Sequence, residues 1–168
     1  VRLGPVLDTV LSAHSYPAPI AQVLAEALVI AALLGALLKE QDAQLTMQAQ
    51  TQAGVIDLLV CDYRNGEVRG HVRYDRARLD DLGPAPTLFS LFGEGYLAIT
   101  FDLAVTGQRY QGIVPLEGNS LASACESYFF QSEQVPTLIR VAFRPGADGC
   151  IAGGLLIQHL PEGEEGRE

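Results

Sequence analysis

The spacing of apolar residues changes along the chain from helical to strand-like. Apolar residues recur at helical spacing between Leu3 and Ala13, and Pro5 suits a first helical position, so a short amphipathic helix is predicted there. The segment Tyr16 to Pro19 must be extended, because each proline disfavours helical conformation in the residue before it. A second helix is therefore expected to start at about Pro19.

That second helix, predicted over Ile20 to Lys39, is apolar around its whole circumference. Such a helix must be buried on all sides or lie in lipid. Gln22 and Glu26 interrupt it, and the remaining apolar run from Ala27 to Leu38 spans only about 18 Å, against roughly 30 Å for a hydrocarbon core. The pattern thus favours a central helix buried between layers of a soluble protein.

After Ala43 the apolar period falls to two, which is the period of a strand with one buried face. Arg64-Asn65-Gly66 is a strong hairpin turn, since Asn-Gly accepts positive φ at both central positions. A second hairpin is expected around Thr106-Gly107. The expected strands are Leu45 to Gln50, Val55 to Tyr63, Glu67 to Asp75, Tyr96 to Leu103, Arg109 to Leu116, Thr137 to Arg144 and Ala152 to Leu160.

Two helical segments interrupt these strands. Thr87 to Phe92 can form one turn of helix, and a longer amphipathic helix is predicted from an N-cap at Gly118-Asn119 to about Gln134, before Pro136. About seven strands and three main helices give an α+β fold. It is expected to consist mainly of antiparallel sheets packed around the buried apolar helix, as a single domain over residues 1–160, with residues 161–168 as an acidic flexible tail.

Composition limits the functions that this chain can have. The chain has 168 residues, of which 48% are hydrophobic and only 18% charged, with a net charge of −9. A strongly acidic chain is a poor partner for nucleic acid or anionic lipid. Lys39 is its one lysine, so it holds no Gly-Lys-Ser/Thr phosphate loop. A low charged fraction indicates a surface that is buried against partners.

The three cysteines and three histidines carry no local signature of a site. Cys61, Cys125 and Cys150 include no Cys-x-x-Cys pair, which argues against bound zinc and favours a reducing cytoplasm. Cys61 and Cys125 fall on apolar strand and helix positions and are expected to be buried and inert, while Cys150 follows a turn and is expected to be the most exposed. His14, His71 and His159 are expected to be ordinary strand and helix-cap residues. We expect no secretory signal, because no basic segment precedes an apolar run at the amino end.

One apolar cluster lacks an obvious structural reason. Phe89, Leu91 and Phe92 lie in a stretch bounded by prolines and glycines, where neither helix nor strand period requires them. They are candidates for an exposed binding patch, although a loop folded over the core would explain them as well. The paired Asp80 and Asp81 are most simply a solvated turn.

The chain resembles the heat-shock protein 33 family, the redox-regulated holdase chaperones of the bacterial cytoplasm. The most diagnostic stretch is RYQGIVPLEGNSLASACESYFFQSEQVPT, from Arg109 to Thr137. Further matching stretches are His14 to Pro19, Leu24 to Leu28, Leu37 to Lys39, Leu45 to Gln48, Gly95 to Thr100 and Gly153 to Gln158. The resemblance covers nearly the whole chain. Glu40-Gln41-Asp42 replaces the family's usual aromatic-and-glycine turn, which puts the shape of that turn in doubt.

The resemblance implies a homodimeric core domain that binds unfolding client proteins under heat and oxidative stress without ATP or catalysis. It also implies a carboxy-terminal zinc centre of four cysteines, which in the whole protein forms disulfides on oxidation, expels zinc and exposes client-binding surface. Neither cysteine pair of that centre is present here, so Cys61, Cys125 and Cys150 are not given its role. Within this chain we expect no cofactor, and Phe89, Leu91 and Phe92 are the candidate client-binding residues.

Two other functional classes remain open at this stage. The chain could be a small cytosolic enzyme with a cysteine or histidine site assembled by folding, which would need a pocket containing perturbed acids or bases. It could also be a purely structural dimerisation module. A chaperone core instead needs a contiguous exposed apolar surface.

Overall fold

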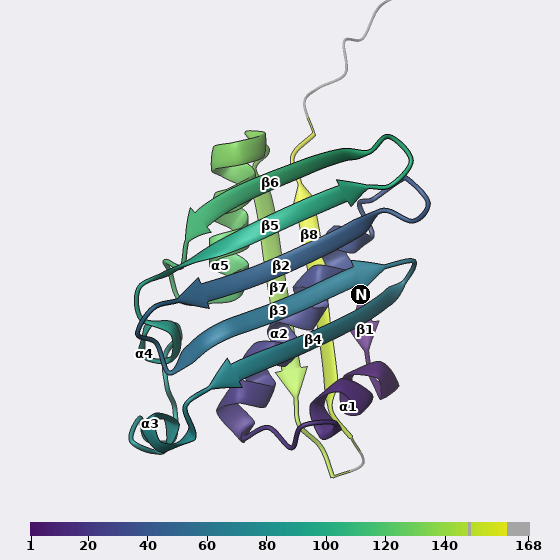
Figure 1. Cartoon of the computed structure of the whole chain (residues 1–168). Coiled ribbons are helices and arrows are strands. Elements are labelled where there is room, and N and C mark those ends of the chain that lie inside the picture. The colour runs from purple at the N-terminus through teal and green to yellow at the C-terminus, as the bar shows by residue number, and fades with distance from the viewer. Residues whose placement is uncertain (148, 161–168) are drawn as a thin grey trace, which may run out of the picture.

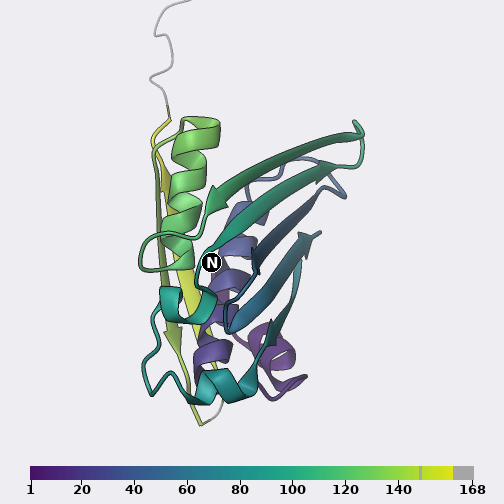
Figure 2. The same ribbon diagram turned by 60° about the vertical axis from the view of Figure 1, so that its left-hand side comes forward.

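An apolar helix, α2 (Ala18–Gly35), lies between two antiparallel sheets (Figure 1). The computed structural model describes residues 1–147 and 149–160, and the acidic tail expected over residues 161–168 lies outside the described residues. Figure 2 shows the layers from the side, with the two sheets on opposite sides of α2. The expected α+β class, with antiparallel sheets around a buried helix, is confirmed.

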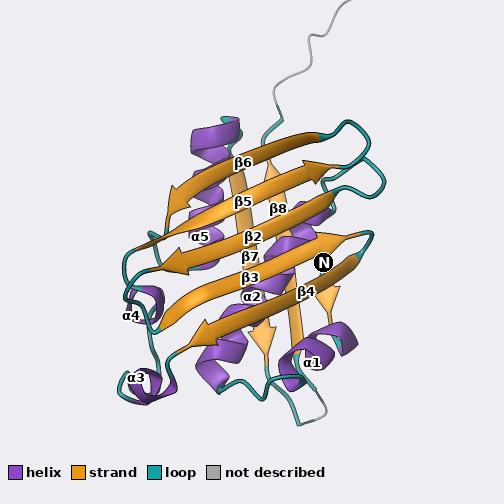
Figure 3. Cartoon of the chain, in the orientation of Figure 1, coloured by secondary structure: helices purple, strands orange, loops and turns teal. Residues whose placement is uncertain are grey.

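The larger sheet has five strands in the order β4-β3-β2-β5-β6, and the smaller has three in the order β1-β8-β7 (Figure 3). All seven expected strands are present, with ends that shift by a few residues, together with one short strand, β1, that was not expected. The strands are β1 (Arg2–Leu3), β2 (Gln44–Thr51), β3 (Ile56–Arg64), β4 (Glu67–Tyr74), β5 (Gly95–Leu103), β6 (Gln108–Pro115), β7 (Thr137–Arg144) and β8 (Ile151–Gln158).

Helix α2 is the centre of the core. Thirteen of its residues are buried, which explains why its sequence is apolar on every side. By length and composition it could span a membrane, with a mean hydropathy of 1.9, but both sheets cover it as the sequence predicted for a core helix.

The extent of α2 differs from the predicted Ile20 to Lys39. The helix ends at Gly35, where the amide of Ala36 donates to the carbonyls of Ala32 and Leu34 and tightens the last turn. A Cβ at Gly35 would overlap the ring of Tyr63, so this position needs glycine for close packing against β3. Leu37 lies beyond the helix and is exposed.

The amino-terminal segment also differs from prediction. Residues Arg2–Leu3 form β1, which pairs with β8, so helix α1 is confined to Pro5–Ser12. A short helix that was not expected, α3 (Arg76–Asp80), follows β4, and its N-cap Asp75 accepts a hydrogen bond from the amide of Arg78.

The later helices form close to where they were predicted. Helix α4 (Leu88–Phe92) begins after Thr87, as expected, and α5 (Leu121–Tyr128) begins at an N-cap that is Ser120 rather than Gly118-Asn119. The hydroxyl of Ser120 accepts from the amide of Ser123, and Gly118 has no side chain that could accept such a bond. Helix α5 continues as the π-helical turn η1 (Phe129–Glu133), and the left-handed Gln134 ends it before Pro136.

Candidate functional site

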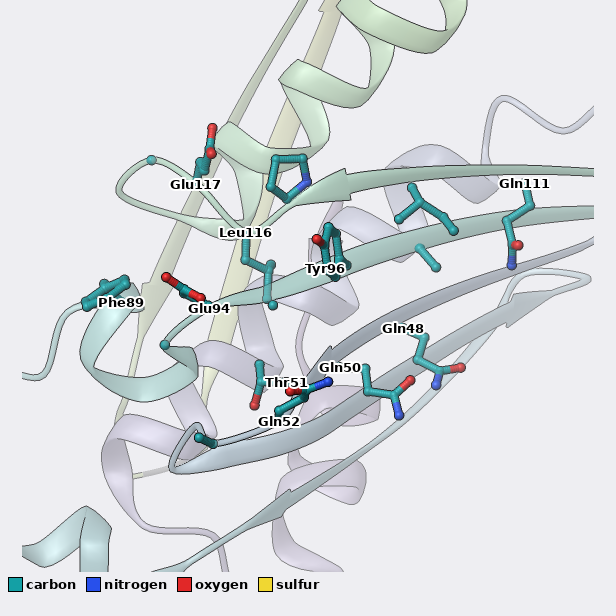
Figure 4. A pocket seen from close by; sticks show the side chains of 17 residues that line it. Gln48, Gln50, Thr51, Gln52, Phe89, Glu94, Tyr96, Gln111, Leu116 and Glu117 are labelled. Carbon is teal, nitrogen blue, oxygen red and sulfur yellow. The ribbon is translucent and has the colours of Figure 1, made fainter.

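The outer face of the five-stranded sheet carries a wide, open trough of about 1380 Å³ across β2, β5 and β6 (Figure 4). The strand register explains its floor, because residues paired across the strands point to the same face. Gln48 pairs with Ala98, and Ala98 pairs with Ile113. One register position further, Gln50 pairs with Tyr96, and Tyr96 pairs with Pro115. The trough is therefore built from the alternate positions of β2, β5 and β6 that face away from α2.

The trough combines exposed apolar side chains with unused amide groups. Tyr96 is 62% exposed and Ile113 is 59% exposed. Gln111 donates to the hydroxyl of Thr100, whereas the side chains of Gln48 and Gln50 make no hydrogen bond to other described residues. Such a surface can contact apolar side chains and also bond to the backbone of an extended polypeptide.

The charged side chains that line the trough are all acidic. Glu94 and Glu117 flank the backbone hydrogen bond from Leu116 to Gly95, and Figure 4 shows both at the same end as Phe89. The lining contains no lysine or arginine. The trough is thus uncharged over most of its floor and negative at one end.

Of the three side chains predicted to form a binding patch, only one is exposed. Phe89 is 68% exposed and lines the trough, whereas Leu91 is 2% exposed and Phe92 is fully buried. Thr87 caps α4 and Gly93 ends it with a positive φ, and this single helical turn directs Leu91 and Phe92 into the core. The expectation of one exposed patch at these three positions is therefore wrong for Leu91 and Phe92.

Sequence reasoning did not find the trough itself. The available signal was the run of uncharged polar residues at alternate positions of β2, namely Thr46, Gln48 and Gln50. An ordinary solvated face of a strand would be expected to carry charged side chains there. Which strands lie beside β2 could not be read from this pattern.

A second exposed apolar surface lies on the outer face of the three-stranded sheet. Leu138 pairs with Ile157 across β7 and β8, and Leu155 lies beside them; we call these three residues the aliphatic stripe. Leu155 is 48% exposed and Ile157 is 58% exposed. Arg140 and Arg144 are exposed on β7, and Arg140 forms an ion pair with Glu126 of α5.

The cysteines occupy the environments expected from their positions. Cys61 and Cys125 are fully buried, and burial raises the pKa of both thiols, so neither is available as a thiolate. Cys150 is half-buried and its amide donates to the carboxylate of Asp8 at 2.7 Å. Among the described residues, no three histidine, cysteine or acidic side chains come together as a metal site. The residues present therefore do not fit a zinc centre.

Two of the histidines are closer than the sequence suggested. The rings of His14 and His71 have centroids 5.2 Å apart, and the hydroxyl of Tyr16 lies 3.2 Å from Nδ1 of His71 and accepts from the amide of Val72. This contact holds the loop between α1 and α2 against the free edge of β4. His159 is separate, and its amide donates to Pro136.

The titratable groups whose pKa values are raised by burial lie in the core rather than in the trough. Burial raises the pKa of Glu26 on α2, although the amides of Ala122 and Leu121 at the start of α5 donate to its carboxylate and oppose that shift. Burial also raises the pKa of Tyr128, whose hydroxyl donates to Glu133 at 3.1 Å. These groups join α5 to its neighbours and do not face a common open pocket.

Comparison with known proteins identifies relatives of this chain. The chain is 40% identical to the "33 kDa chaperonin" of Caulobacter vibrioides over 166 residues, which is 94% of this chain and 54% of that protein. It is also 40% identical to the "33 kDa chaperonin" of Yersinia pestis over 169 residues, covering 100% of this chain and 56% of that protein. The chain thus spans about half the length of these curated relatives.

The fold has a matching crystal structure. The 33 kDa chaperonin (heat shock protein 33 homolog) of Thermotoga maritima superposes with a TM-score of 0.76 at 27% identity, over 90% of this chain and 52% of that one. The family model described as "Hsp33 protein" matches residues 1–168. With this match over its whole length, the chain belongs to the Hsp33 family of chaperones.

Proposed function

We propose that this chain is the client-binding core of an ATP-independent holdase, and that the trough receives extended segments of unfolding proteins. The observation that carries the proposal is the combination of exposed Tyr96 and Ile113 with unbonded Gln48 and Gln50 on one concave sheet face. An unfolded segment presents both apolar side chains and unpaired backbone groups, so a surface with both kinds of partner suits it. Phe89 extends the apolar contact at one end.

The strength of such binding is limited. A few hundred Å² of apolar contact, at about 25 cal/mol per Å², is offset in large part by the lost freedom of the client. The surface would therefore hold an unfolding client weakly and reversibly, and it has no energy source with which to refold it. This agrees with a holdase rather than a folding machine.

Regulation of the whole protein is a separate proposal. The relatives are nearly twice as long as this chain, and we propose that their additional length carries the zinc centre and the redox switch. Cys61 and Cys125 are buried and do not take part in it. We propose that without this additional part of the protein the trough is open in either redox state.

The homodimer and the cellular compartment also stay proposals. The low charged fraction of 18% and the resemblance to a dimeric family support a symmetric dimer of this chain in the cytoplasm. We propose no nucleic-acid or membrane partner, since the chain is acidic and the long apolar helix α2 is covered by the two sheets.

An enzymatic function has less support. Belonging to a chaperone family implies a protein without catalytic activity. Cys61 and Cys125 are buried in separate elements, and His14 and His71 contact only each other and Tyr16 among the aromatic side chains described. We therefore propose no catalytic residue.

The decisive experiment is suppression of aggregation of a heat-denatured client, followed by light scattering. We expect this chain to suppress aggregation equally when reduced or treated with peroxide, with or without ATP and a zinc chelator. Suppression that appears only after oxidation would assign a switch to one of the three cysteines. If suppression is absent in both states, the client site lies in the part of the relatives that this chain does not span.

A further inference from the structure

The trough has a charge asymmetry that its proposed role as a client surface does not require. Glu94 and Glu117 lie at one end, both exposed, and no lysine or arginine lines the trough. Neither glutamate forms an ion pair with another described residue. A client surface that recognised only apolar side chains would have no use for two unneutralised carboxylates beside its exposed aromatic rings.

Most arginines of the surrounding sheet are already engaged, and Arg109 lies at the opposite end of β6, where it pairs in register with Asp102. On the same outer face, Arg69 pairs with Asp62 and Arg73 pairs with Asp57. Arg78 is engaged by the backbone, since its guanidinium donates to the carbonyls of Gly54 and of Ala53, which lines the trough. Among the described residues, Glu94 and Glu117 therefore have no cationic partner and can bind a cation of a client.

Two aromatic rings stand beside these acids. Phe89 is 68% exposed and Tyr96 is 62% exposed, and Figure 4 shows Phe89 at the end where Glu94 and Glu117 lie and Tyr96 further along the trough, towards its middle. A guanidinium group can stack on an aromatic face while it donates hydrogen bonds to a carboxylate, whereas an ammonium group is a more strongly hydrated point charge. The pairing of carboxylates with open aromatic rings therefore suits arginine in particular.

We infer that the trough selects extended client segments that carry arginine next to aliphatic residues. The arginine binds between Glu94, Glu117 and the rings of Phe89 and Tyr96, and the aliphatic part of the segment lies over Ile113. The backbone of the segment bonds to the free amides of Gln48 and Gln50. This inference rests on the proposed function, and it names the class of client segment that the trough prefers.

The test compares two peptides that differ only in charge. One is a short labelled peptide of valine, leucine and threonine with two arginines, and the other has citrulline, the neutral analogue, at both arginine positions. Fluorescence anisotropy should show that the citrulline peptide binds this chain roughly 3- to 10-fold more weakly at low salt, the range expected for exposed ion pairs with some stacking. The difference should shrink as salt is raised.

Variants of the chain locate the effect. In Glu94→Gln/Glu117→Gln the preference for arginine should disappear, and both peptides should bind with about the affinity of the citrulline peptide for the unchanged chain. The control Asp80→Asn/Asp81→Asn changes the net charge by the same amount on exposed residues outside the trough and should keep the full preference. A preference that is lost equally in both double variants reflects overall charge and overturns the inference.

The remaining outcomes separate this inference from the proposed function. If both peptides bind equally well, and Ile113→Gln weakens both, the trough is a client site without charge selection and the inference fails alone. If neither peptide binds this chain, the proposed function fails with it. If peptide binding is blocked in proportion to self-association measured by sedimentation, a second copy of the chain occupies the trough and the inference is wrong.

Discussion

The outer faces of the two sheets expose apolar side chains to a similar extent but differ in what surrounds them. Ile113 on β6 is 59% exposed and Ile157 on β8 is 58% exposed. Ile113 lies in a concave surface with two glutamine amides and two acids that have no partner among the described residues. Ile157 lies on a stripe of leucine and isoleucine, where the neighbouring Arg140 is already paired with Glu126.

This difference shows that exposed apolar area alone does not identify a client surface. Burying the trough under a purely apolar partner would strand the amides of Gln48 and Gln50, and an unsatisfied polar group costs about 1–3 kcal/mol. Burying the aliphatic stripe strands no comparable side-chain amide. The trough thus favours a partner with free backbone groups, and the stripe favours a partner that is itself apolar, such as a second copy.

The largest expected effect tests how the core supports the trough. A Cβ at Gly112, on the inner side of β6, would overlap the ring of Tyr128. Gly112→Ala should therefore lower the free energy of unfolding by about 1–3 kcal/mol, the usual cost of overpacking a core. Gly153→Ala is the matched change on β8, where only the carbonyl of the terminal Val1 lies near, at 3.3 Å. It should change stability by about 0.5 kcal/mol or less in thermal or urea unfolding.

The second prediction concerns self-association through the aliphatic stripe. Ile157→Gln changes both copies in a symmetric dimer, so we expect the dissociation constant to rise about tenfold by sedimentation. Ile113→Gln, which removes a side chain of equal exposure, should leave it nearly unchanged. The opposite result would place the dimer contact on the trough and break the comparison between the two faces.

The third prediction concerns client binding by the trough. Ile113→Gln should raise the amount of chain needed to suppress client aggregation about fivefold, which corresponds to about 1 kcal/mol for a partly buried aliphatic side chain. Ile157→Gln, compared at a concentration where both variants have the same oligomeric state, should behave like the unchanged chain. Equal losses would show that the two faces do not differ in client binding.

The smallest effect concerns the core that joins both faces. Burial raises the pKa of Glu26 above its usual 4.5, so ionisation of Glu26 opposes folding. We compare the free energy of unfolding of the unchanged chain with that of Glu26→Gln. The difference should favour the unchanged chain most below the ordinary pKa of a glutamate, and this advantage should be lost as pH rises through the raised pKa of Glu26 in the folded chain. Glutamine does not titrate, so the variant should lack this dependence, and its side-chain oxygen can still accept from the amide of Ala122.

Urea unfolding of both proteins between mildly acidic and neutral pH measures that difference. A difference that is constant with pH would mean that the hydrogen bonds from Ala122 and Leu121 balance the effect of burial on Glu26. Neither outer face should be affected, because Glu26 lies on the central helix.

Local patterns predicted most of the secondary structure because their causes are local. Asn65 and Gly66 both have positive φ in the β3–β4 turn, as an Asn-Gly hairpin requires. Pro17 is the N-cap of α2 and Pro19 is its second residue, and the last helix ends before Pro136. The end of α2 could not be read in this way, because Gly35 is placed by contact with Tyr63, a residue of another element.

The candidate site was predicted less well, for a physical reason. Phe89, Leu91 and Phe92 share one apolar run, but a single helical turn exposes the first and buries the other two. The strand β1 was missed because two residues form it only by pairing with β8, more than 140 positions away. His14 and His71 likewise meet only because Tyr16 binds the edge of β4.

The sequence by itself determined the family, the α+β class and the buried central helix. These depend on residue identity and on a hydrophobic period that each segment carries within itself. Only the tertiary structure decided which strands lie beside β2, and so which side chains share a face. Gln48, Tyr96 and Ile113 come from three strands and form one surface because of register, which is a property of pairing between distant segments.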